Sequence, residues 1–155
     1  MDNELINIKG KVRVILTDVN TGEQDISEWK QNLVTTAGKV AILRRMGNIA
    51  TKTSEGMITY GAVGTATTVP VVADTTLGTE LARKAVSVSS IAGSQLTLRV
   101  FYTTAEANGA LKEFGWFGEE ATAAADTGTL FNHVLIDKTK TAAKTLTIEQ
   151  IFEFA

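Results

Sequence analysis

The 155-residue sequence contains no cysteine and only one histidine. Without cysteine there is no disulfide framework and no thiolate metal ligand, and a histidine-based metal site would have a single imidazole to combine with carboxylates. No apolar run approaches the roughly 20 residues needed to cross a bilayer, and the opening residues MDNELINIKG lack the apolar stretch of a secretion signal. We therefore expect neither a membrane partner nor secretion.

The sequence also lacks an excess of positive charge. It has 17 acidic and 15 basic side chains, which give a formal net charge of −2. Proteins that bind nucleic acid usually present a basic patch or a clearly basic domain. The composition therefore predicts no nucleic-acid partner.

Glycine-rich phosphate-binding motifs are missing as well. Gly61, Gly64 and Gly78 do not have the Gly-x-Gly-x-x-Gly spacing that lets backbone approach a pyrophosphate. The Gly-Lys pairs at Gly10 and Gly38 are followed by valine, whereas a Walker loop needs serine or threonine there. We interpret the glycines around position 64 as part of a structural connection, and we predict no cofactor.

Catalytic and metal-binding patterns are equally scarce. No Gly-x-Ser-x-Gly elbow accompanies His133, which is expected to pack or hydrogen-bond across strands. Acid pairs at Glu119–Glu120 and at Glu149 with Glu153 could in principle supply acid–base chemistry or bind a cation such as calcium. We expect both pairs to lie on solvated faces, and we predict no enzyme activity, no catalytic residue and no metal site.

The sequence does contain a strong pattern of short strands. At this length the chain is the size of one domain, residues 1–155. An apolar segment at 12–16 runs into the turn residues of 18–22, which predicts a strand and a hairpin. The stretch NLVTTAGKVAILRRMGN changes to a helical period, with Thr36 as the expected N-cap and Gly47 at the stop position.

Further strands follow with period-two alternation. Leu96, Leu98, Val100 and Tyr102 share one face, and Asn108–Gly109 is the strongest short hairpin signal in the sequence. The final strand places Leu146, Ile148, Phe152 and Phe154 on one face, with Gln150 as a polar exception, and it must pair within the subunit or with a neighbour. We predict a mainly β fold: an antiparallel β-sandwich with one short helix and a long Gly/Thr-rich loop.

The loop between Gly64 and Glu80 holds the only proline of the chain. We expect it to form a surface arm or lid, with Leu77 and Leu81 anchoring it to the body. In the segment EFGWFG, Phe114 and Trp116 fall on one face of a strand and Phe117 on the other. This pattern favours core or subunit interface over a platform that stacks on sugars or bases.

Four stretches occur together in an order that is more specific than any of them alone: NLVTTAGKVAILRRM, the threonine-rich loop and its flanks at 58–83, AEANGALKEFGWFG, and GTLFNHVLI leading into TLTIEQIFEF. This order resembles small structural proteins of tailed bacteriophages, including the domain by which some tail-fibre and baseplate-associated proteins attach to the virion. The resemblance begins at about Asn32, so the strand and hairpin segment 1–31 lies outside it. His133 stands where the resemblance leads us to expect a basic residue.

The resemblance implies a non-enzymatic virion structural protein that works through contacts with copies of itself and with other virion proteins. A tail position at a fibre, collar or baseplate is expected, and a capsid decoration protein is the alternative. A carbohydrate-binding module or small hydrolase that uses the aromatic stretch and the acids is a weaker alternative. We expect a homo-oligomer, since apolar residues remain on faces opposite the predicted core. The candidate interface residues are Phe101, Phe117, Leu135 and Ile151 on strands, and Val69, Pro70 and Val71 on the arm.

Overall fold

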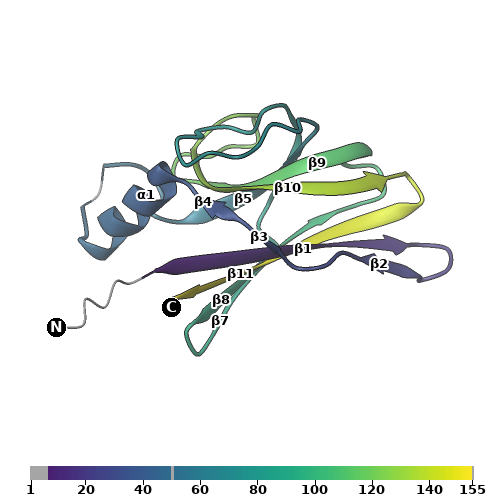
Figure 1. The fold of residues 1–155 in the computed structure, drawn as a ribbon, viewed down its shortest axis with the longest axis horizontal. Coiled ribbons are helices and arrows are strands. Elements are labelled where there is room, and N and C mark those ends of the chain that lie inside the picture. The colour runs from purple at the N-terminus through teal and green to yellow at the C-terminus, as the bar shows by residue number, and fades with distance from the viewer. Residues whose placement is uncertain (1–6, 50, 155) are drawn as a thin grey trace.

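The computed structural model describes residues 7–49 and 51–154, and over these residues the chain forms eleven strands and one helix. The strands make two antiparallel sheets that face each other, with the helix beside one end (Figure 1). The predicted β-sandwich with one short helix is therefore confirmed.

The six-stranded sheet contains the first and last strands of the chain. Its strand order is β2-β1-β11-β8-β7, and β3 also pairs with β1. The final strand finds its partners within the subunit, because it pairs with β1 along one side and with β8 along the other. The members of this sheet are β1 (Ile8–Asp18), β2 (Gln24–Ile26), β3 (Lys30–Gln31), β7 (Val88–Ala92), β8 (Gln95–Tyr102) and β11 (Lys144–Phe154).

The five-stranded sheet has the order β4-β10-β9-β5-β6. The chain crosses from one sheet to the other just before Gly109, the first residue of β9, because β8 belongs to the six-stranded sheet and β9 to this one. The hairpin predicted at Asn108–Gly109 is therefore wrong, although Gly109 has a φ of 131°. Glycine adopts a positive φ where the chain crosses between sheets as readily as it does in a hairpin. The members of this sheet are β4 (Leu33–Val34), β5 (Ile58–Gly64), β6 (Glu80–Ala85), β9 (Gly109–Gly118) and β10 (Thr129–Lys140).

Alternating side chains of both sheets fill the space between them. Leu98, Val100 and Tyr102 are buried on the face that the alternation predicted. Phe114 and Trp116 come from the opposite sheet and meet edge to face, with ring centroids 5.0 Å apart and ring planes at 89°. Such a pair stabilises a core by about 0.5 to 1.5 kcal/mol beyond its burial.

A small polar network crosses this core at Gln150. The indole Nε1 of Trp116 donates to Gln150 Oε1 over 3.2 Å, and Asn132 Nδ2 donates to the same oxygen over 2.9 Å. Gln150 Nε2 in turn donates to Asn32 Oδ1 over 2.8 Å. The polar exception in the last strand is explained by these contacts, because buried donors need acceptors.

The helix α1 (Thr36–Met46) packs against β10. Its N-cap is Thr35, one residue earlier than expected, and Thr35 Oγ1 accepts from Gly38 N over 2.9 Å. Gly38 touches the backbone of Phe131 so closely that a Cβ there would lie 2.5 Å from the Phe131 carbonyl oxygen. Glycine is thus required for this helix to approach the sheet, and Gly47 ends the helix as predicted.

Candidate functional site

The segment 65–79, which we call the arm, joins β5 to β6 and lies over the outer face of the five-stranded sheet (Figure 1). Glu113 of β9 is fully buried beneath it. Glu113 Oε1 accepts from Ala66 N over 3.2 Å and from Thr79 N over 2.8 Å, and Oε2 accepts from Gly78 N over 2.9 Å. One carboxylate therefore holds both ends of the arm.

His133 connects the arm to the sheet at a second place. Its Nε2 lies 2.8 Å from Glu113 Oε2, and its Nδ1 lies 2.8 Å from Oδ2 of Asp74 in the arm. Burial raises the pKa of Asp74, but the hydrogen bonds from His133 and from Val71 N outweigh it, so the pKa of this carboxyl lies below its usual value. Both ring nitrogens face carboxylates, so neither is placed to take a proton from a serine or threonine hydroxyl. His133 acts here as a cross-strand hydrogen-bonding residue, as expected from sequence.

A second, smaller apolar cluster lies under the arm. Phe117 is fully buried there against Leu77, and the guanidinium of Arg83 lies 4.4 Å from the centre of its ring. The expectation that Phe117 contacts another subunit is wrong, because the arm of the same chain covers it. Leu77 anchors the arm as predicted, but Leu81 is 44 % exposed and does not.

The middle of the arm remains exposed. Val69 is 72 % exposed, Val71 is 53 % exposed and Val72 is 48 % exposed, while Pro70 between them is half-buried. Val71 N donates to Asp74 Oδ2 over 2.9 Å, so this apolar ridge is fixed to an anchored residue. Residues 69–72 are thus presented to solvent by an arm that is held at both ends.

Phe101 and Ile151 lie on the outer face of the six-stranded sheet. Phe101 is 42 % exposed and Ile151 is half-buried. Glu149 lies on the same face, between Phe101 and Ile151. It accepts from Arg13 Nε over 3.0 Å and from Arg99 Nε over 2.5 Å. Glu149 is only 4 % exposed, so the expectation of a solvated carboxylate is wrong at this position; the two arginines cover it.

The predicted interface residues do not form one patch. Leu135 is half-buried on β10, where it pairs with Glu113 on the five-stranded sheet. Phe101 and Ile151 belong to the other sheet, and Val69 and Val71 belong to the arm. The chain therefore offers separate apolar surfaces.

The expectation that Glu119 and Glu120 both lie on a solvated face is wrong for Glu119, whereas Glu120 is exposed. Glu119 is fully buried and accepts from Arg44 Nη2 over 2.7 Å and from Gly56 N over 2.9 Å. Arg44 also contacts Glu55. Burial raises the pKa of Glu55, but hydrogen bonds from Arg44 and from backbone N–H groups lower it to about 2. This cluster ties α1 to the end of β9.

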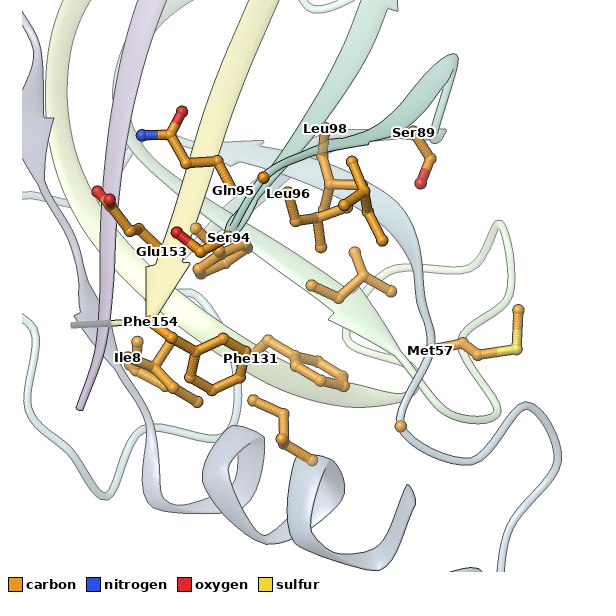
Figure 2. A pocket seen from close by; sticks show the side chains of 17 residues that line it. Ile8, Met57, Ser89, Ser94, Gln95, Leu96, Leu98, Phe131, Glu153 and Phe154 are labelled. Carbon is orange, nitrogen blue, oxygen red and sulfur yellow. The ribbon is translucent and has the colours of Figure 1, made fainter. Parts of the chain in front are cut away.

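An apolar pocket with a volume of about 550 Å³ opens between the two sheets at the end next to α1 (Figure 2). Sequence reasoning missed it, because its walls come from segments far apart in the chain. Phe131, Phe154 and Leu96 are among the side chains around it, and Gln95 and Glu153 add polar groups. Its size is in the range of small-molecule sites and of pockets that receive side chains from a partner.

The aromatic platform considered for sugars is not available at Phe114 and Trp116, because both rings are buried in the main core. Across residues 7–49 and 51–154, we find no group of three or more His, Cys, Asp or Glu side chains placed to hold a metal ion. Over the same part of the chain, no helix is both long and apolar enough to cross a membrane.

Comparison of the chain with protein-family models, with curated proteins and with solved structures gives no match.

Proposed function

We propose that this chain is a non-enzymatic structural subunit of a tailed-bacteriophage particle, placed at a tail position such as a fibre, collar or baseplate. In this role it binds copies of itself and other virion proteins. The proposal starts from the ordered sequence stretches described above and is supported by the way the subunit presents apolar surface.

The observation that carries the proposal is the exposed apolar ridge on an anchored arm. Val69, Val71 and Val72 face solvent, although the arm itself is fixed through Glu113 and His133. Contiguous exposed apolar surface marks interaction sites in soluble proteins. Because the arm is already ordered, a partner that covers the ridge does not have to offset the entropy of ordering it. This design suits a subunit that works by assembly.

The outer face of the six-stranded sheet supports the same role. Phe101 and Ile151 lie beside the Arg13–Glu149–Arg99 ion pairs on a regular β surface. Interfaces commonly combine aromatic side chains and arginine in this way. The face therefore has the composition of a contact surface.

The test is a copy count in purified particles of the phage that encodes the chain. Quantitative mass spectrometry against the major capsid protein is expected to give tens of copies or fewer per virion, as a tail position requires. Hundreds of copies would favour the capsid decoration alternative over a tail position. Absence of the chain from purified particles would overturn both.

A further inference from the structure

The strand β7 forms one edge of the six-stranded sheet. All five of its residues are exposed, and among the residues that the structure describes its ladder partner is β8. In an antiparallel pair, every second residue directs its N–H and C=O away from the partner strand. The outer side of β7 therefore carries a row of backbone donors and acceptors available to another strand.

The sequence of β7 gives this edge no protection. Val88, Ser89, Ser90, Ile91 and Ala92 include no charge and no proline. Exposed edges are normally guarded by charged residues, proline or bulges against pairing with other chains. The contrast lies within the same molecule, because the edge strand β6 contains three charged residues and the edge strand β2 contains an aspartate.

The unprotected edge is also a wall of the apolar pocket. Ser89 and Ile91 both line the pocket, and Figure 2 shows Ser89 at its border above Met57. Ile91 is nevertheless 78 % exposed. A strand added beside β7 would extend the inner face of the sheet and bring its own side chains to the pocket mouth.

We infer that β7 is the surface by which two copies of this chain associate, through antiparallel pairing of the two β7 strands about a two-fold axis at Ser90. This pairing sets Ile91 of each copy opposite Ser89 of the other, next to the pocket. On the other face it sets Val88 opposite Ala92. The inference rests on the proposed function, since it names one surface through which copies of the structural subunit meet.

A second copy is favoured as the occupant because β7 is complementary to itself. In the two-fold pairing about Ser90, each residue of β7 faces a small or β-branched residue of the other copy, and no like charges face each other. The two-fold arrangement gives each copy the same contacts and ends with two subunits, which is how closed dimers form. It also joins the two six-stranded sheets into one continuous sheet.

The chain has no cysteine, so a single introduced thiol tests this geometry directly. In the proposed pair the two Ser90 Cα atoms lie about 4.5 to 5.5 Å apart, which is within the range of about 4.4 to 6.8 Å that a disulfide spans. The variant S90C is expected to form a disulfide-linked dimer with oxidised glutathione. The matched control S87C places an exposed thiol three residues away, where the two Cα atoms lie about 20 Å apart. Equal or faster crosslinking of S87C would overturn the inference.

Sedimentation of the full chain over a concentration series tests the association without a covalent bond. I91K is expected to weaken the dimer at least about tenfold, because a side chain that becomes buried is replaced by a charge. The control I26K changes an exposed isoleucine on β2, at the opposite edge of the same sheet, and should leave the dimer unchanged. A wild-type chain that stays monomeric, or a dimer that I91K does not weaken, would refute the proposal. Both tests use purified protein, so they are independent of whether virions contain the chain.

Discussion

Replacing Glu113 is the most direct way to test how the arm is held. Its carboxylate receives backbone N–H groups at both ends of the arm, from Ala66, Gly78 and Thr79, and it also contacts His133 Nε2. The substitution E113A removes every one of these acceptor contacts at once. We expect the arm to detach from the sheet while both sheets stay folded, since the main core lies on the other face.

The size of the effect follows from the number and burial of these contacts. A hydrogen bond to a charged group contributes about 1.5 to 3 kcal/mol, and a buried donor left without an acceptor costs about 1 to 3 kcal/mol. Detachment of the arm limits the loss, because the freed N–H groups then reach water. Because three backbone N–H groups lose their acceptor, we expect E113A to lower the free energy of unfolding by about 3 to 5 kcal/mol. E113Q keeps the side-chain shape and separates the loss of charge from the cavity.

Urea unfolding followed by tryptophan fluorescence measures the loss in stability. Hydrogen exchange at Ala66, Gly78 and Thr79 reports on the arm itself, and these amides should exchange much faster in both Glu113 variants. E153Q is the control, since Glu153 is an exposed carboxylate on β11. Variants of Glu113 that lose less than about 1 kcal/mol, with the arm amides still protected, would show that the carboxylate does not hold the arm.

Three further predictions concern other contacts. Glu55 has a pKa of about 2 instead of its ordinary value of 4.5. Its ionised carboxylate therefore stabilises the fold fully at pH values above 4.5, and this contribution is lost as the pH falls towards about 2. Urea unfolding over this range should therefore depend less on pH in E55Q, and an unchanged slope would contradict the ion-pair role. The double variant V69S/V71S should keep the wild-type melting temperature but be incorporated into particles less well, as measured by mass spectrometry of purified virions. Full incorporation would show that the arm is not part of the assembly surface. Q150L should lower the free energy of unfolding by about 1 to 3 kcal/mol in urea titrations, because Trp116 Nε1 loses its acceptor, and a neutral effect would mean that the indole finds another one.

Local patterns predicted the elements well. Period-two alternation located β8 and β11, and the helical period with a threonine cap and a glycine stop located α1 to within one residue at its start. These signals depend on neighbours in sequence, which is why they could be interpreted without the fold. The chain turns before Gly109, but the hairpin expected at Asn108–Gly109 is absent, because a turn signal does not say which sheet the next strand joins.

The candidate interface was harder to predict. The alternation of side chains along a strand assigns each residue to one of two sheet faces, but it does not show which other part of the chain covers that face. Phe117 was assigned to a contact between subunits, yet Leu77 and Arg83 of the same chain cover it. Glu149 was expected in solvent, yet Arg13 and Arg99 bury it. In each case the covering residues are far away in the sequence, so a local pattern cannot predict the contact.

The sequence by itself determined the β class, the helix, the position of the long connection and the polar exception at Gln150, because backbone propensity and side-chain period are local properties. Only the tertiary structure decided that Glu113 and His133 fasten the arm, that β7 is an edge strand and that a pocket opens beside it. These features depend on strand order in two sheets, which brings distant residues together. Strand order is set by the packing of the whole core, and no local pattern in the chain encodes it.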